Sequence, residues 1–246
     1  MMNKKIIKYC LSLLSVVFHY NRKSKVLYLH DVHAGTQYAF DDRSMPIEDF
    51  LRILEAVKKE GFEIVTNITE KKNQVRLCFD DGYRGIWDCR EILSKSGIFP
   101  TIFIATSLMG DKNHLTTDEI RALSDMGFPI QSHTISHRPL TIHDTRELNA
   151  ELTESKEILE KTTHKQVTEI CLPLGFFNEN VLSCCLSVYD RVFMSVPGSY
   201  WDDLNQGLVR RILCQDASPS IIRLALLGGQ NIFFQRIRKQ HYHKNA

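Results

Sequence analysis

The chain alternates short apolar runs with amphipathic stretches, and this alternation predicts its architecture. Each apolar run has the length and residue types of a buried strand. The eight runs lie at residues 26–30, 62–65, 75–79, 99–105, 128–133, 167–173, 191–196 and 208–214.

Segments with helical periodicity lie between these runs, and several carry start signals. Thr116 and Glu119 form a capping box ahead of a helix that ends at Gly127, and Ser44 with Pro46 opens another. The helix that Ser44 and Pro46 open covers residues 47–60, and the other expected helices cover residues 86–96, 146–161 and 179–187. Strands that alternate with helices call for parallel strands joined by crossovers, either in an open doubly wound sheet or in a closed barrel. Eight runs favour an α/β fold with a distorted (β/α) barrel of seven or eight strands.

Both ends of the chain differ from this pattern. Lys4, Lys5 and Lys8 precede an apolar stretch at residues 9–18, which is shorter than the roughly 20 residues that span a bilayer. A helix packed on the domain or lying on a membrane surface is favoured, and a cleaved signal peptide is the alternative.

The other end begins with a Ser-Pro helix start and includes a basic stretch at residues 233–239. It is expected to be a solvated outer helix, with a membrane-surface role as the alternative. We therefore expect an N-terminal helix at residues 1–24, one barrel domain at 25–217, and a C-terminal helix with a basic tail at 218–246.

Composition narrows the class of protein. With 246 residues, 43% hydrophobic and 24% charged, the chain has the profile of a globular protein. Its net charge of +2 creates no field that would attract nucleic acid, so we expect no nucleic-acid partner. Seven cysteines without a regular spacing favour a reducing, cytoplasmic location, with export as the alternative. Nothing in the sequence predicts the oligomeric state.

The sharpest chemical signal is Asp80-Asp81-Gly82, which directly follows the apolar run at residues 75–79. Two adjacent carboxylates repel each other, so placing them at the mouth of a buried strand is costly unless a cation lies beside them. The alternative is a polar turn without a ligand.

A second signal is the pair His133 and His137, which ends the run at residues 128–133. Two imidazoles four residues apart suit a shared divalent metal, and two histidines with one carboxylate leave open coordination positions, as catalytic zinc sites do. The alternative is one polar and one packed histidine. In a barrel the carboxyl ends of the strands share one rim, which would bring these residues near the two aspartates.

Two more strand ends carry candidate chemistry. Pro173 and Gly175 close the run at residues 167–173, and such a fixed turn either is a simple connection or aims a backbone N–H at a developing oxyanion. His30 ends the first run and is either a packed histidine or an acid on the shared rim.

In combination, Asp-Asp-Gly after an apolar strand, His-x-x-x-His about fifty residues later and a downstream Pro-x-Gly resemble the polysaccharide deacetylase family, also called the NodB-homology or carbohydrate esterase 4 family. The resemblance extends from Lys25 to Ala217. It implies a NodB-type, TIM-like barrel and a divalent metal, with Zn²⁺ expected and Co²⁺ or Ni²⁺ as alternatives. The implied reaction removes acetyl groups from an N-acetylated glycan.

The resemblance also implies roles for individual residues. Asp81, His133 and His137 correspond to the metal ligands, and Asp80 corresponds to the catalytic base. The backbone N–H of Leu174 corresponds to the oxyanion donor.

The sequence departs from the family in its third and last motifs. Cys171 and Leu174 stand where the family usually has the arginine and tyrosine of Arg-x-Pro-Tyr. Arg210 and Arg211 are candidates to supply the missing guanidinium, and Arg211 is preferred because strand alternation points only one of them inward. The family's Leu-x-His general acid does not occur after Val209.

His30 follows Tyr28 at the end of the first run, and it resembles the acid of the rearranged poly-N-acetylglucosamine deacetylase type. The missing motifs leave two other hypotheses open. One is a catalytically silent, metal-containing carbohydrate-binding protein. The other is a deacylase of a small N-acyl compound.

Overall fold

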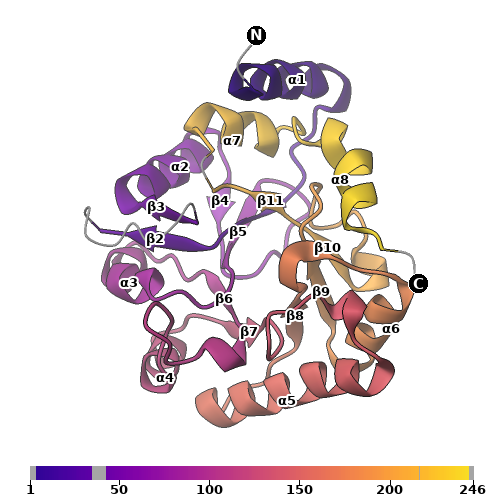
Figure 1. Ribbon diagram of the computed structural model, residues 1–246. Helices are drawn as coiled ribbons and strands as arrows, with labels where there is room; N and C mark the ends of the chain where they lie inside the picture. The colour runs from indigo at the N-terminus through magenta and orange to yellow at the C-terminus, as the bar shows by residue number, and fades with distance from the viewer. Residues whose placement is uncertain (1–3, 35–42, 216, 244–246) are drawn as a thin grey trace.

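A computed structural model describes residues 4–34, 43–215 and 217–243, and it shows a ring of parallel strands surrounded by helices (Figure 1). The strands follow the order β10-β9-β8-β7-β6-β5-β1-β11, and each neighbouring pair is parallel. Their bounds are β1 (Lys25–Leu29), β5 (Gln74–Phe79), β6 (Thr101–Ile104), β7 (Ile130–Ser132), β8 (Glu169–Cys171), β9 (Arg191–Met194), β10 (Leu208–Arg210) and β11 (Ile212–Leu213). The expected distorted α/β barrel is confirmed.

The barrel closes within one short stretch of chain. β10 pairs with β9, where Val209 lies opposite Phe193, and β11 pairs with β1, where Ile212 lies opposite Leu27. Only Arg211 separates the two strands. The apolar run at residues 208–214, expected as a single strand, therefore changes partner at Arg211 and joins the two edges of the sheet.

Amphipathic helices cover the outside of the ring. They are α2 (Ile47–Lys59), α3 (Gly85–Lys95), α4 (Thr117–Asp125), α5 (Thr145–Thr163), α6 (Glu179–Val188) and α7 (Pro219–Leu226). α2 buries Phe50, Ile53 and Val57 on one face, at the spacing that an amphipathic helix requires. α4 begins at the predicted capping box, in which Thr116 accepts from Glu119 N–H and the Glu119 carboxylate accepts in return.

Two ion pairs and an aromatic layer fill the inside of the barrel. Toward the amino ends of the strands, Arg76 Nη1 lies 2.9 Å from Glu169 Oε1. Above this pair, Phe103 and Phe193 lie with their ring centroids 5.0 Å apart. The second ion pair joins Arg211 to Asp80. Its guanidinium lies 5.7 Å from the centre of the Phe103 ring, on the side toward the carboxyl ends of the strands. The aromatic layer thus separates a structural ion pair from the end of the barrel where the candidate site lies.

The strand predictions differ from the structure in two further places. The run at residues 62–65 forms only the two-residue β4 (Glu63–Ile64), which pairs with the start of β5 outside the barrel order. It stays short because β6 pairs with the later part of β5. The sequence also gave no sign of β2 (Asp31–His33) and β3 (Ser44–Pro46), which pair with each other and are too short to show alternation.

The terminal segments lie on the outside of the barrel. α1 (Lys4–His19) lies along α7, and the short helix η6 (Asn231–Phe233) leads into α8 (Phe234–His241) (Figure 1). None of the helices in the described ranges has both the length and the hydropathy of a transmembrane segment.

Candidate active site

The polar residues that end the strands converge on one cavity of about 220 Å³ at the carboxyl ends of the barrel. Asp80 and Asp81 follow β5, His133 follows β7, and His30 follows β1. The lining comprises Tyr28, His30, Arg43, Asp80, Asp81, His133, His137, Leu172, Leu174, Ser195 and His241.

Asp81, His133 and His137 form the centre of the cavity. Asp81 Oδ1 lies 3.1 Å from His133 Nε2 and 2.9 Å from His137 Nε2. One potential ligand atom from each residue lies within 4.8 Å of the others. Burial raises the pKa of Asp81, but its hydrogen bonds with the two imidazoles outweigh this effect and hold the pKa below its usual range. The carboxylate is therefore ionised at neutral pH.

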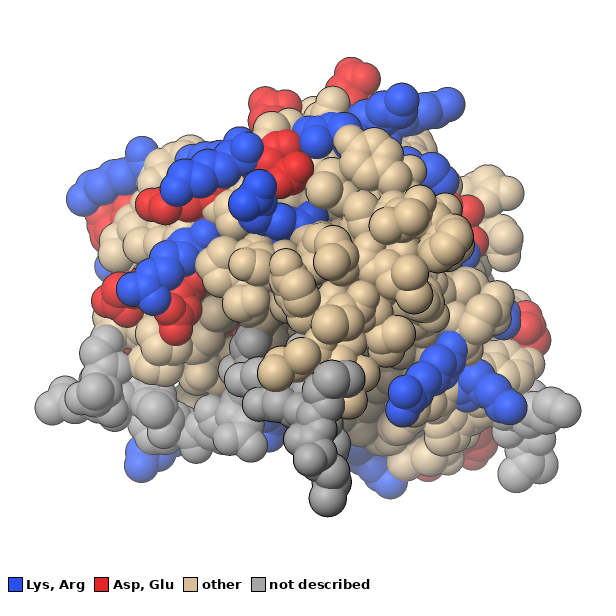
Figure 2. All heavy atoms as spheres, turned by 90° about the horizontal axis from the view of Figure 1, so that it is seen from above, with Lys and Arg blue, Asp and Glu red and all other residues tan. Residues whose placement is uncertain are grey.

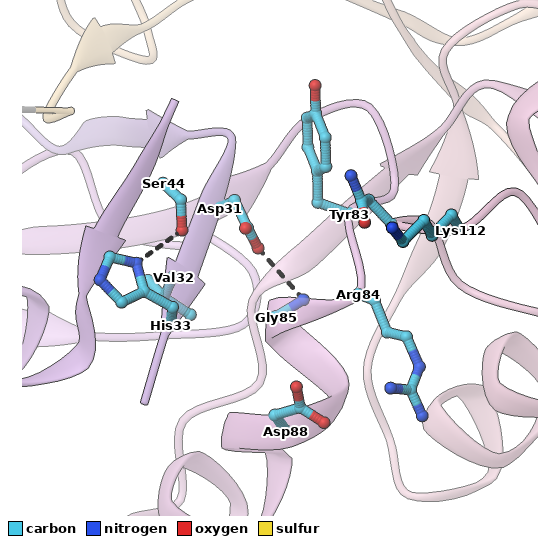
Figure 3. Close-up of a pocket in the computed structure, with 10 residues that line it drawn as sticks. Asp31, Val32, His33, Ser44, Tyr83, Arg84, Gly85, Asp88 and Lys112 are labelled. Carbon is cyan, nitrogen blue, oxygen red and sulfur yellow. Dashed lines mark hydrogen bonds between the residues drawn. The ribbon is translucent and has the colours of Figure 1, made fainter. Parts of the chain in front are cut away.

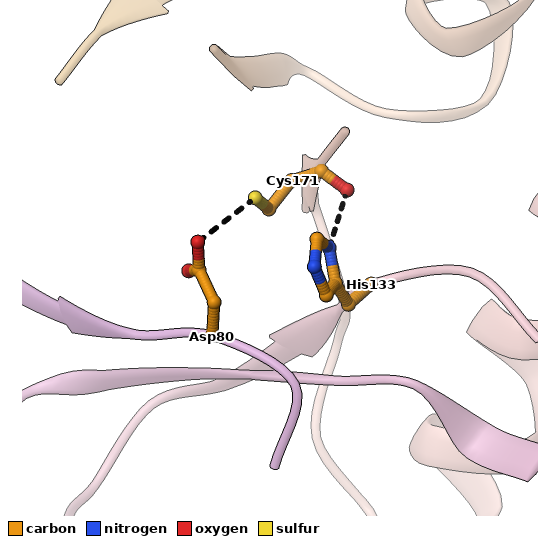
Figure 4. A group of neighbouring side chains, drawn as sticks. All are labelled: Asp80, His133 and Cys171. Atoms are coloured by element: carbon orange, nitrogen blue, oxygen red, sulfur yellow. Dashed lines mark hydrogen bonds between the residues drawn. The ribbon is translucent and has the colours of Figure 1, made fainter. Parts of the chain in front are cut away.

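The tautomer of His133 suits this trio to a metal. Its Nδ1 lies 2.8 Å from the carbonyl oxygen of Cys171, which can only accept a hydrogen bond (Figure 4). Nδ1 must therefore carry a proton, so Nε2, which faces Asp81 Oδ1, is the nitrogen that would bind a metal in place of the proton it shares with Asp81. His137 is partly open to solvent. Two imidazoles and one carboxylate with an open side fit a divalent ion that keeps exchangeable positions.

Backbone strain is concentrated at this site. Asp81, Thr134, His137 and Leu174 all have positive φ, at 70°, 69°, 56° and 55°. Residues other than glycine rarely adopt this conformation, and each instance costs about 1–3 kcal/mol. Among the described residues only Asn73 and His164 share it elsewhere, and His164 does so as the C-cap of α5. Clustered strain of this kind is typical of functional sites.

Glu151 holds the loop between His133 and His137, and the sequence alone did not identify it as a site residue. Its Oε2 accepts hydrogen bonds from Ile135 N–H at 2.8 Å and Ser136 N–H at 3.0 Å. Burial opposes ionisation, but these bonds lower the pKa of Glu151 below its ordinary value. An acidic residue beside Leu148 and Leu152 on the buried face of α5 was the signal that could have revealed it.

Asp80 is clamped by Arg211, the residue at the barrel seam. Arg211 Nη1 donates to Asp80 Oδ1 at 2.7 Å and Nη2 donates to Oδ2 at 2.9 Å, and both side chains are buried. Burial raises the pKa of Asp80, but the Arg211 guanidinium outweighs it and lowers the pKa. Arg210 points away and pairs with Asp203. Strand alternation thus separates the two arginines, with Arg211 inside.

Cys171 gives Arg211 the space to reach Asp80. Its Sγ lies 3.6 Å from Asp80 Oδ2 (Figure 4). The same Sγ lies 2.9 Å from Arg211 Nη2. The guanidinium also stacks over the Tyr28 ring at 4.0 Å, which fixes its plane. The Arg211 guanidinium therefore lies beside Cys171 on β8, the position where the resemblance places an arginine.

Two further imidazoles reach the cavity from opposite ends of the chain. His30 lines the cavity, and its Nδ1 is buried without a hydrogen-bond partner in the described residues. Gln215 Oε1 accepts from the His30 backbone N–H at 3.1 Å. His241, at the end of α8, has an unpartnered Nδ1 of the same kind, and burial lowers its pKa. The sequence places His241 only in the basic C-terminal segment, because no local pattern shows where α8 packs.

Leu174 forms part of the cavity wall. It lies in the turn η4 (Pro173–Gly175) with φ 55° and ψ 3°, and its side chain is exposed. A Cβ added at Gly175, which has φ 72°, would lie 2.7 Å from Ser195 Cβ, so only glycine allows the turn to approach β9 so closely.

A second cavity of about 140 Å³ lies beside the first, between β2, β3 and the start of α3 (Figure 3). Asp31 Oδ1 accepts from Gly85 N–H at 3.1 Å, and His33 Nδ1 lies 2.8 Å from Ser44 Oγ. Tyr83 lines this cavity, and the guanidinium of Arg43, which lines the first cavity, lies 5.9 Å from its ring. The two cavities are therefore neighbours across Tyr83 and Arg43.

The sequences that this chain resembles are those of proteins named as polysaccharide or peptidoglycan deacetylases. The model of the polysaccharide deacetylase family matches residues 67–187. YxkH of Bacillus subtilis (strain 168), provisionally named a polysaccharide deacetylase, is 26% identical over 202 residues, which cover 77% of this chain and 71% of that protein. Peptidoglycan-N-acetylmuramic acid deacetylase PdaA of the same organism is 30% identical over 140 residues, covering 55% of this chain and 52% of PdaA.

The fold is also found among solved structures. The Streptococcus pyogenes deacetylase PplD in complex with acetate superposes with a TM-score of 0.73 and 22% identity. The superposition covers 83% of this chain and 98% of PplD. This likeness supports the barrel fold.

The contact between Glu151 and the histidine loop leads to a prediction about metal affinity. Glu151→Leu leaves two loop N–H groups without an acceptor, so we expect zinc affinity to fall about 10- to 100-fold. Glu151→Gln keeps an acceptor oxygen and should lose less. Competition with a chelating indicator measures the affinities, and Glu154→Leu, at an exposed position of the same helix, is the control. Unchanged affinity in Glu151→Leu would contradict the role given to this contact.

Proposed function

The chain belongs to the polysaccharide deacetylase family, and we propose that it is a metal-dependent hydrolase that removes N-acetyl groups from a polysaccharide or a glycan precursor. The observation that carries the proposal is the convergence of Asp81, His133 and His137 beside an Asp80 that Arg211 clamps. The trio suits a divalent ion, and the neighbouring carboxylate suits a base.

Asp81, His133 and His137 would hold the ion, with Zn²⁺ as the expected metal because two imidazoles and a carboxylate match its preferred ligands. When bound, such an ion supplies Lewis acidity to an amide carbonyl and lowers the pKa of water. The Cys171 carbonyl keeps His133 in the tautomer that can bind it.

Asp80 is placed to act as general base. It is ionised, it lies next to the metal-binding Asp81, and both of its oxygens are fixed by Arg211. In this proposal Asp80 accepts the proton of the attacking water, and Arg211 positions the carboxylate without touching the substrate.

The leaving amine needs a proton and the oxyanion needs a donor. His30 is the proposed acid because its unpartnered ring nitrogen lies on the wall of the same cavity. The Leu174 N–H, held in the strained turn η4, is the proposed oxyanion donor.

An N-acetylated glycan chain is favoured as substrate over a small N-acyl compound. The cavity at Asp80 has a neighbour across Tyr83, so a chain could extend from one into the other. PdaA, by its name, acts on N-acetylmuramic acid of peptidoglycan, which is a substrate of this class. A catalytically silent binding protein is disfavoured because Arg211 supplies the guanidinium that the third motif lacks.

Separate substitutions should uncouple metal binding from turnover. We expect Asp80→Asn to keep stoichiometric metal and to lose about 10²- to 10⁴-fold in acetate release from N-acetylglucosamine oligomers, because only the base is removed. His133→Ala should lose the metal itself. Elemental analysis and an acetate assay on the same preparations measure both properties. Full turnover by Asp80→Asn would contradict its role as base.

The pH profile tests the clamp on Asp80. A general base works only when ionised, so kcat/KM falls as pH drops through its pKa. Because Arg211 lowers that pKa, Arg211→Lys, which loses the bidentate geometry, should move the acidic limb to higher pH. We expect kcat to fall about 10²-fold with little change in KM.

Arg210→Lys is the matched control, since Arg210 pairs with Asp203 outside the barrel. Adding Cys171→Arg to Arg211→Lys should restore part of the rate by delivering a guanidinium from β8. An acidic limb that stays in place in Arg211→Lys would argue against the clamp.

The two unpartnered histidines can be told apart by substitution. His30→Ala should lower kcat about 10²- to 10⁴-fold, and the loss should shrink for an amide whose leaving amine is weakly basic. His241→Ala should mainly raise KM, because a histidine whose pKa is lowered is neutral and is suited to hydrogen-bond a sugar hydroxyl. If instead the rate loss of His241→Ala shrank for an amide with a weakly basic leaving amine, His241 would be the acid.

A further inference from the structure

Helix α1 packs on the barrel with its small polar side rather than its apolar side. Ser12 and Ser15 are buried, and Ser15 Oγ donates to Gly228 O at 3.0 Å and accepts from Ile232 N–H at 3.3 Å. The contact is close because the facing residues are glycines. A Cβ on Gly229 would lie 2.9 Å from the carbonyl oxygen of Ser12. This packing holds the helix flat along the barrel wall.

The large apolar side chains of α1 consequently face outward. Val17 and Phe18 are 72% and 73% exposed. Other exposed side chains on this helix are Ile6, Ile7, Tyr9, Leu11, Leu13 and Leu14. Figure 2, which looks onto α1, shows a broad area without charged side chains, with basic and acidic side chains at its margins. An exposed apolar area of this kind marks an interaction surface.

The two ends of the chain are basic in sequence, although Arg22, Lys23 and Arg223 pair with acidic residues and Lys25 is buried. Residues 1–30 and 217–246 contain eleven Lys or Arg and no Asp or Glu, whereas the remainder contains 20 basic and 29 acidic residues. The two terminal segments meet, because α1 contacts both α7 and η6, and α8 continues from η6. Lys8 on α1 and Arg236, Arg238 and Lys239 on α8 are exposed. No acidic side chain in the described ranges forms an ion pair with these four residues.

We propose that the outward face of α1, with the basic residues of α8 beside it, docks onto an anionic lipid bilayer. A flat helix with exposed apolar residues and flanking cations inserts its apolar side chains among the acyl chains while the cations contact the headgroups. A second copy of the chain fits this surface less well, because two cationic faces repel each other. The charge therefore selects anionic lipid as the occupant.

The docking surface adjoins the rim of the candidate active site. A groove beside the first turns of α1 is lined by Ile6, Lys8 and Tyr9 together with Gln215 and Ser218. Gln215 is also the residue that accepts from the backbone N–H of His30. A bilayer under α1 would thus lie close to the end of the barrel where the strands terminate.

Vesicle sedimentation of the full chain tests the proposal. Vesicles of phosphatidylcholine with about a quarter phosphatidylglycerol should bind the protein, and pure phosphatidylcholine should bind it at least about tenfold more weakly. Binding should weaken with added salt. The variant Val17→Asp/Phe18→Asp should lose about tenfold or more of the binding to anionic vesicles, since both exposed apolar side chains are replaced by anionic ones.

Ile158→Asp is the matched control, because Ile158 is an exposed apolar residue on α5, which lies across the barrel from α1 (Figure 1). It should bind as the parent does. Thermal melting checks that each variant folds, and acetate release from a soluble oligomer should be unchanged in all of them. Equal binding to both vesicle types would overturn the proposal. So would a concentration-dependent dimer in sedimentation velocity that Val17→Asp/Phe18→Asp abolishes.

Discussion

Two adjacent buried carboxylates impose the central constraint on this structure. Asp80 and Asp81 end β5, both are almost inaccessible, and both remain ionised because each has its own counter-groups. The guanidinium of Arg211 pairs with Asp80, whereas two imidazoles face Asp81. A buried carboxylate without a partner would cost several kcal/mol, so the fold must deliver both sets of groups to the end of one strand.

This requirement explains features that are far apart in the chain. The closing strand breaks into β10 and β11 at Arg211, so the residue that clamps Asp80 lies at the seam where the barrel closes. Glu151 fixes the loop that carries the imidazoles, and the carbonyl of Cys171 selects the tautomer of His133. Each contact restricts a group that would otherwise be free to rotate, beside a cluster of residues with positive φ.

The sequence predicted those features that depend on local patterns. Strand-helix alternation indicated the barrel, and the strand ends placed Asp80, Asp81 and His133 on one rim. Strand alternation favoured Arg211 over Arg210, and a register shift of one residue would have reversed that choice. Glu151 and His241 were missed because their positions depend on how α5 and α8 pack, which no local pattern encodes. The short β2 and β3 carry too few residues to show a period.

The claim on which the account rests is that Asp81, His133 and His137 bind one divalent ion. The most direct measurement is a crystal structure of the purified protein with diffraction data collected on both sides of the zinc absorption edge. The account predicts one strong anomalous peak within bonding distance of an Asp81 oxygen and of both Nε2 atoms. The absence of such a peak in zinc-saturated crystals, or a peak bound elsewhere, would contradict it.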